Sequence, residues 1–475
     1  MFSLHNHTDY SNASRSFADC SHTLNDLIVR AKNLGINGIA ITDHEITSSY
    51  VKAEKLSREL DFPIIMGNEI YLLKDEDDKA FREDGRNAFY PHFILLALDK
   101  IGVQQIWKLS KSAWENGYYN KGLMRTPTVM SKVEEVVGQD KGHIVASTAC
   151  LGGFIGRTIL KIRETKDEQE VVRLKKEIVK FINWGKSVFG EDNFYLECQP
   201  ASEEQLDQIY VNDFIKNISK GMGVPYIITT DSHYLRKEDL PLHSAFLNAK
   251  EDEGDEREVE SFYKTAYLMS EEEVKEYFIK NNGWTDSEFQ IAVDNTEKIG
   301  EKWKKYSLYH KPIIPKRDIP KDFKCSPMFF PNNMEYINKC LNSEYEQDRF
   351  LMYLLEQAIK ERIPKEDYQE TFERIELELT EIWLVSESIE DRMSAYFNTM
   401  NKNIEICWQE ANAICGVGRG SGVSSIIDYL LDITQINPLK MPVDMPFWRF
   451  MDRSRPELPK VYWALIVNLA KGCAI

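Results

Sequence analysis

Short apolar runs alternate with amphipathic stretches over the first half of the chain. Seven runs stand out, at residues 1–5, 35–44, 62–73, 91–99, 142–150, 193–200 and 224–234. Between them, segments such as 23–35 and 168–190 place apolar residues at helical spacing. This alternation is typical of β/α units. The pattern predicts an α/β domain between residue 1 and about residue 245.

The second half of the chain has a different pattern. An acidic segment at 250–260 interrupts the alternation and is interpreted as a solvated linker or loop, and a basic, proline-containing stretch follows at 302–324. From about 335 to 413 the periodicity is helical, and it ends at the glycine-rich turn GVGRGSG (416–422), which opens another helix. A chain of 475 residues is too long for one ordinary core, so two or three domains are expected.

Composition narrows the class of protein. Hydrophobic residues make up 43% and charged residues 28%, which indicates globular domains. The net charge of −17 argues against non-specific coating of nucleic acid, although it allows a local basic groove. The eight cysteines form no CxxC pair and the chain opens directly into an apolar run, which favours a reducing cytoplasm. The run from Val461 to Ala470 is about half the length of a membrane span, so no membrane contact is expected.

Potential metal ligands lie at the ends of the predicted strands. His5 and His7 form an HxH pair whose rings project to the same side of an extended chain. Residues at the C-terminal ends of parallel barrel strands converge on one face. His92 begins its run instead, so it reaches the same rim only if its strand is locally antiparallel. Imidazole, carboxylate and a single thiolate together suit Zn²⁺, Mn²⁺ or Fe²⁺, and two or three such ions predict hydrolysis of a phosphate ester.

Six motifs carry a resemblance to a known family. LHNHTDYSN, GIAITDHE, GNEIYL, HFILLALDK, ASTACLGG and TTDSHYL resemble, in order and spacing, the PHP domain of bacterial DNA polymerase III alpha subunits. The resemblance implies a distorted seven-stranded β/α barrel with a trinuclear metal site. The metal ligands that it implies are His5, His7, Asp19, His44, Glu69, His92, Cys150, Asp231 and His233.

Two aspartates leave an alternative open. Asp9 competes with Asp19 as a ligand, because the loop before Asp19 is slightly longer than in relatives. Asp9 and Asp43 are otherwise interpreted as carboxylates that orient histidine ligands. Family members with the full ligand set act as metal-dependent 3′–5′ exonucleases, so the resemblance implies that activity here.

The glycine-rich turn has two interpretations. Its backbone amides, the following helix N-terminus and Arg419 could hold a phosphate, or it could be a plain turn between helices. The surrounding sequence, up to RPELP (455–459), resembles the start of the palm of the same polymerases. That resemblance implies a palm of the polymerase-β type, in which Arg419, Gly420 and Ser421 contact the triphosphate of the incoming nucleotide.

The chain departs from the family after this point. The polymerases carry an Asp-x-Asp pair that holds the catalytic Mg²⁺ ions, whereas this chain has Lys460, Val461 and Tyr462. Without those carboxylates the chain is expected not to polymerise DNA unless the palm is completed. The apolar end of the chain is interpreted as foreign sequence, such as a read-through intron, a frameshift or a gene break.

The predicted organisation is a PHP domain at 1–245, a connecting region at 246–330, a partial palm with a helical region at 331–459 and a non-family tail at 460–475. The preferred function is the N-terminal portion of a polymerase III alpha subunit with an exonuclease. The alternatives are a stand-alone phosphatase for a small phosphoester such as histidinol phosphate, and a non-catalytic replisome scaffold. The expected partners are primer-template DNA, a second polypeptide that carries the rest of the polymerase, and the sliding clamp with other replisome proteins.

Overall fold

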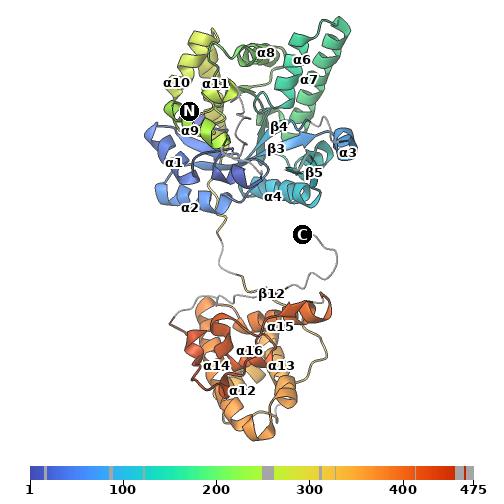
Figure 1. Ribbon diagram of the computed structural model, residues 1–475, viewed down its shortest axis with the longest axis vertical. Coiled ribbons are helices and arrows are strands. Elements are labelled where there is room, and N and C mark those ends of the chain that lie inside the picture. Colours follow the sequence, from blue (N-terminus) through green and yellow to red (C-terminus); the bar gives the residue numbers. More distant parts are fainter. Residues whose placement is uncertain are drawn as a thin grey trace. The chain divides into compact units, whose positions relative to one another are not determined.

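The protein forms two compact units, Met1–His310 and Lys311–Ile475 (Figure 1). The computed structural model describes residues 1–14, 19–84, 89–120, 123–248, 261–309, 313–326, 328–411, 413–454 and 465–466. The acidic segment at 250–260 lies outside the described residues, as does the predicted tail at 460–475 apart from Leu465–Ile466.

The first unit is built on a curled sheet. Seven strands follow one another in space in the order β1 (Phe2–Ser3), β2 (Gly38–Ile41), β3 (Ile64–Leu73), β4 (His92–Ala97), β8 (Ile144–Ser147), β9 (Phe194–Cys198) and β10 (Tyr226–Ile228). An eighth strand, β7 (Thr128–Val129), extends one edge of β3. Each of the seven apolar runs contributes one strand of this path, so the α/β fold class predicted from the alternating pattern is confirmed.

One strand of the sheet runs against the others. β4 pairs antiparallel with both β3 and β8, whereas the other neighbours along the path are parallel. The register places His92, the first residue of β4, opposite Tyr71 near the C-terminal end of β3. The prediction that a locally antiparallel strand brings His92 to the rim is therefore confirmed.

The two ends of the sheet meet at that same rim. Asn6 and Ser232, which follow β1 and β10, form a parallel bridge. The His7 N–H donates to the Ser232 carbonyl at 3.0 Å, and the Ser232 N–H donates to the His5 carbonyl at 3.3 Å. The curled sheet thus closes into a distorted barrel at the end where the histidines lie.

Helices cover the outside of the barrel (Figure 1). Capping fixes where several begin: Thr23 forms a capping box with Asp26, and Asp99 accepts from Ile101 and Gly102. Their apolar faces pack on the sheet because i, i+3, i+4 spacing puts them on one side, as Leu24, Leu27 and Ile28 show. The helices are α1 (Leu24–Asn33), α2 (Tyr50–Leu60), α3 (Asp75–Asp84), α4 (Lys100–Glu115), α5 (Met130–Val136), α6 (Phe154–Glu164), α7 (Glu168–Phe189), α8 (Leu206–Met222), α9 (Leu240–Leu247), α10 (Glu271–Glu276) and α11 (Asp286–Lys302). A small hairpin is formed by β5 (Tyr118–Asn120) and β6 (Leu123–Arg125).

The region predicted as a connection at 246–330 includes part of the first unit. α11 lies against β10, where it buries Phe289, Ala292 and Val293 in the main core. The Asn295 amide donates to the Tyr226 carbonyl, which fixes α11 to the strand. The first unit therefore extends well past residue 245.

The second unit is helical, as the periodicity predicts. Its described helices are α12 (Glu335–Leu341), α13 (Glu346–Arg362), α14 (Tyr368–Ile389), α15 (Met393–Gln409) and α16 (Ile426–Leu430). They share a separate core that contains Leu351, Leu355, Ile375 and Leu379. β11 (Ile414–Cys415) pairs antiparallel with β12 (Leu465–Ile466). Across the described parts of both units, no helix has the length and apolar character that a bilayer span needs.

Candidate metal centre

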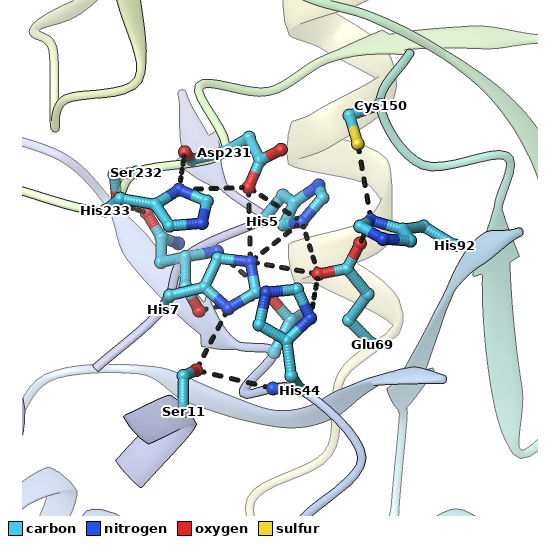
Figure 2. Close-up of polar contacts among 12 residues, drawn as sticks. His5, His7, Ser11, His44, Glu69, His92, Cys150, Asp231, Ser232 and His233 are labelled. Carbon is cyan, nitrogen blue, oxygen red and sulfur yellow. Dashed lines mark hydrogen bonds and ion pairs between the residues drawn. The ribbon is translucent and has the colours of Figure 1, made fainter. Parts of the chain in front are cut away.

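The structure brings all nine sequence-predicted ligands together at the closed rim of the barrel. Figure 2 labels all of them except Asp19. They form three groups in which the possible ligand atoms lie within 4.8 Å of one another. His7 belongs to the first two groups and Glu69 to the last two, so the groups adjoin. The groups are His7, Asp19, His44 and His233; His5, His7, Glu69 and Asp231; and Glu69, His92 and Cys150.

Local backbone structure aims these side chains at a common point. His5 and His7 are two residues apart on the extended segment after β1, so both rings project to one side. His44 follows β2 and forms a parallel bridge with Glu69. Asp231 adopts φ of +46°, a left-handed conformation that aspartate tolerates better than most residues. This turn allows Asp231 and His233 to reach the same cluster from one loop.

Glu69 lies at the centre of the cluster (Figure 2). Its Oε2 is 3.0 Å from His7 Nε2 and 3.0 Å from His44 Nδ1, and its Oε1 is 2.5 Å from His92 Nδ1. Asp231 Oδ1 is 3.1 Å from the Nε2 atoms of both His5 and His7. The Cys150 Sγ lies 3.5 Å from His92 Nδ1. One carboxylate therefore touches ligands of all three groups.

The donor set fits divalent metal ions. Carboxylate oxygens only accept hydrogen bonds, and the Nε2 atoms of His5 and His7 face each other at 3.3 Å. His5, His7 and Glu69 are completely buried, and such a concentration of lone pairs away from water is costly without a cation. Nitrogen, oxygen and one sulfur donor suit Zn²⁺, Mn²⁺ or Fe²⁺ better than Mg²⁺.

The pKa shifts describe the same electrostatic balance. Burial lowers the pKa of His7, but the Asp231 and Glu69 carboxylates outweigh burial and raise it to about 9. Burial likewise opposes Asp231, Glu197 and Glu69 at His5, where the carboxylates raise the pKa well above its usual value. Burial raises the pKa of Glu69, and the surrounding histidines more than reverse this, so it lies well below the usual range. Protons on His5 and His7 are thus favoured by the carboxylates when no cation is bound, and a bound metal would displace them.

Asp19 and Asp9 have different positions. Asp19 is buried, and its Oδ2 lies 3.1 Å from His44 Nε2 within the first group. Asp9 is exposed and accepts the Leu24 N–H at the start of α1, at 3.2 Å. The structure therefore places Asp19, and not Asp9, among the candidate ligands, and Asp9 stabilises the helix instead of orienting a histidine.

Asp43 occupies the position predicted for a carboxylate that orients a ligand. It accepts hydrogen bonds from the Thr8 N–H at 2.8 Å and from the Ser11 hydroxyl at 2.9 Å. Ser11 Oγ lies 3.1 Å from His7 Nδ1 (Figure 2). Asp43 thus holds the His7 ring through Ser11, which leaves Nε2 of that ring facing the cluster.

Glu197 is a buried carboxylate next to the cluster that the sequence analysis missed. This buried carboxylate on β9 lies 2.7 Å from His5 Nδ1 through its Oε1. It also accepts from the hydroxyls of Ser147 at 2.5 Å and Thr229 at 2.6 Å. The sequence feature that could have indicated it is a single acidic residue inside the apolar run at 193–200.

A cavity of about 540 Å³ gives access to the cluster from solvent. Asp19, His44, His92, Cys150, Asp231 and His233 line its floor. Its walls include Arg157 from α6, together with Phe262 and Tyr263. Both aromatic rings lie edge-on to the His233 ring.

The glycine-rich turn of the second unit lies at the surface. Arg419 and Gly420 are exposed, and Gly420 adopts φ of +79°, which favours glycine. The expected contribution of the following helix N-terminus is absent, because α16 is only five residues long and its first amides are occupied. Ile426 and Ile427 donate to the buried carboxylate of Glu378 at 2.7 and 3.1 Å. A phosphate at this turn would depend on Arg419, Gly420 and Ser421.

Comparisons with known proteins agree with this division of the chain. Residues 3–201 match the PHP domain family, and residues 349–461 match the family described as bacterial DNA polymerase III alpha NTPase domain. The DNA-directed DNA polymerase of Bacillus phage SPbeta is 38% identical over 483 residues, which cover 97% of this chain and 36% of the phage protein. The DNA polymerase III subunit alpha of Borreliella burgdorferi is 28% identical over 459 residues, which cover 96% of this chain and 34% of that protein.

The chain spans about a third of the length of these relatives. Among solved structures, an amidohydrolase from Chromobacterium violaceum aligns with 49% of this chain and 87% of its own, with 14% identity and a TM-score of 0.30. The PHP match lies in the first compact unit, and the polymerase III alpha match lies in the second. Over nearly its whole length the chain is therefore similar to DNA polymerases, including polymerase III alpha subunits, with the PHP match in its first unit and the polymerase III alpha match in its second.

Proposed function

We propose that the first unit is a metal-dependent phosphodiesterase that shortens DNA from its 3′ end. The observation that carries the proposal is the convergence of nine metal-binding side chains into three adjoining groups beneath an open cavity. Nine such side chains suffice for two or three ions, and Zn²⁺, Mn²⁺ and Fe²⁺ are the candidates. The similarity to DNA polymerases supports DNA as the substrate.

Residues around the cluster hold the candidate ligands in position in the absence of substrate. When bound, the metal ions would supply an activated hydroxide and charge neutralisation at the phosphoryl oxygens. Glu69 connects the three groups, so a change at this residue affects all of them. Glu197 orients His5, and Asp43 orients His7 through Ser11. Buried carboxylates therefore fix the two central imidazoles with their Nε2 atoms facing the cluster.

An exonuclease assay tests the proposal. Metal-reconstituted protein is incubated with a primer-template that carries a mismatched 3′ end, and separately with small phosphomonoesters. We expect stepwise shortening from the 3′ end, and we expect His7→Ala to abolish it, because His7 contributes to two of the three groups. His143→Ala is the matched control, since that histidine pairs with Asp99 outside the cluster.

Two outcomes would contradict the exonuclease. Turnover of phosphomonoesters with an intact primer would identify a phosphatase for small substrates. Inactivity on both substrates, with metal bound at the cluster, would indicate a scaffold without catalysis.

We also propose a role in replication for the second unit. Support comes from its match to the polymerase III alpha family at 349–461. In this proposal Arg419, Gly420 and Ser421 contact the phosphates of an incoming nucleotide. Primer-template DNA, the sliding clamp and a polypeptide that supplies the remaining polymerase, with its Mg²⁺ ions, are the partners.

A further inference from the structure

A second cavity leads away from the metal centre along α6. It has a volume of about 380 Å³ and shares Phe89, His92 and Arg157 with the cavity over the cluster. The two cavities therefore adjoin and share part of their lining. We call the second one the α6 groove and define it by Lys74, Phe81, Phe89, Phe154, Arg157 and Lys161.

One face of α6 supplies much of this groove. Phe154, Arg157 and Lys161 are spaced i, i+3 and i+7, so they lie along one side of the helix. Arg157 borders the metal cavity, and Lys161 lies one turn farther away, about 6 Å along the helix axis. A chain that enters at the cluster and follows α6 would meet the two cations in succession.

The groove is cationic although the protein as a whole carries a net charge of −17. Arg173, which also lines it, is committed to Glu170 and Glu177. Within the described part of the chain, no carboxylate forms an ion pair with Lys74, Arg157 or Lys161. The lining holds two carboxylates, Asp77 and Glu177, against four cations, so the groove has a positive excess.

Aromatic rings alternate with the cations. Lys74 Nζ lies 5.6 Å from the centre of the Phe154 ring, and the Arg157 guanidinium lies 4.7 Å from that of Phe89. Phe81 and Phe89 are half-buried, so part of each ring faces the groove. Cations that contact phosphates beside rings on which bases stack are the chemistry of single-stranded nucleic-acid binding.

We propose that the α6 groove binds the single-stranded DNA whose 3′ end lies at the metal centre. This inference rests on the proposed exonuclease and specifies the form of its substrate. A base can stack on the phenylalanine rings only when it is unpaired, so the strand enters as a single strand. Arg157 and Lys161 contact successive phosphates, and the phenylalanine rings contact bases without selecting among them.

Fluorescence anisotropy with 5′-labelled oligothymidylate tests the groove directly. The full chain is used in the presence of a chelator, so that the oligonucleotide stays intact, and circular dichroism checks the folding of each variant. Lys161→Ala should weaken binding about 5-fold, and the slope of log affinity against log salt should fall by about 0.7 for the lost phosphate contact. Lys74→Ala removes a second positive charge from the groove and should also weaken binding. Lys111→Ala, a 74% exposed lysine of α4, is the control and should bind as the wild type does.

Three results would overturn the inference. The first is wild-type affinity in both Lys161→Ala and Lys74→Ala, and the second is an equal loss in Lys111→Ala. The third is competition by unlabelled blunt duplex as strong as that by the single strand. The proposed function is tested separately by hydrolysis of bis(4-nitrophenyl) phosphate, which has no chain to occupy the groove. Its absence in metal-loaded wild-type protein would count against the phosphodiesterase and leave the binding result intact.

Discussion

At the scale of single residues, Glu197 orients the candidate ligand His5 through the ring nitrogen that faces away from the cluster. Its carboxylate fixes Nδ1 of His5 and so leaves Nε2 facing Glu69 and Asp231. Glu197→Gln keeps the shape of the side chain but removes its charge, which makes the His5 imidazole a weaker electron-pair donor to a metal ion. We expect metal affinity to fall by about 10-fold, measured by titration against a chromophoric chelator.

A surface carboxylate provides the control for this experiment. Glu204 is 73% exposed and pairs with Lys264, so Glu204→Gln should leave the metal affinity unchanged. A Glu197→Gln protein that binds metal as tightly as the wild type would remove Glu197 from the site.

The positions of the candidate ligands could be predicted from the sequence, whereas that of Glu197 could not. His5, His7, His44 and His233 are uncommon residue types at the ends of apolar runs, and parallel strands bring such ends together. The position of Glu197 depends on hydroxyls that are distant in the sequence, those of Ser147 at the end of β8 and of Thr229 just after β10. No local pattern reports such contacts.

At the scale of elements, α14 and α16 are joined by a buried carboxylate. Glu378 accepts from Arg374 on its own helix and from the first amides of α16. The sequence gives little indication of this, because Glu378 is one of many glutamates in α14 and only the packing of the two helices buries it. The glycine-rich turn, in contrast, could be located from the sequence, because the spacing of glycines is a local property of the chain.

Asp428 on α16 makes the stability of the second unit depend on pH. Only 1% of its surface is exposed, and burial together with nearby Glu378 raises its pKa well above the usual value. A raised folded-state pKa means that the stabilising contribution is complete below the unfolded value, about 3.9. It is lost as the pH rises toward the folded value, at about 1.4 kcal/mol per unit of pKa difference.

Asp428→Asn should remove that dependence. We expect the melting temperature of the second unit to fall less between pH 5 and pH 8 in this variant than in the wild type, as measured by calorimetry. Asp444→Asn, at an exposed carboxylate of the same unit, should retain the wild-type slope. Equal slopes in Asp428→Asn and the wild type would show that Asp428 ionises without cost in the folded protein.

At the scale of the whole molecule, the candidate metal ligands found among the described residues all lie in one of the two units. All nine candidate ligands belong to Met1–His310, and the second unit has its own hydrophobic core. Ligands that bind only the folded state stabilise it by mass action, so a chelator should destabilise the first unit alone. Calorimetry should resolve two transitions, since separate cores need not unfold together.

The size of the shift follows from the affinity. At a metal concentration a thousandfold above the dissociation constant, removal of the metal costs about 4 kcal/mol, which lowers the melting temperature of the first unit by roughly 6 °C. His44→Ala should bind less metal, melt earlier and respond less to the chelator, because His44 belongs to the first group and also contacts Glu69. A chelator that moved both transitions equally, or moved neither, would contradict a metal centre confined to the first unit. The unaffected transition of the second unit serves as the internal control in every scan.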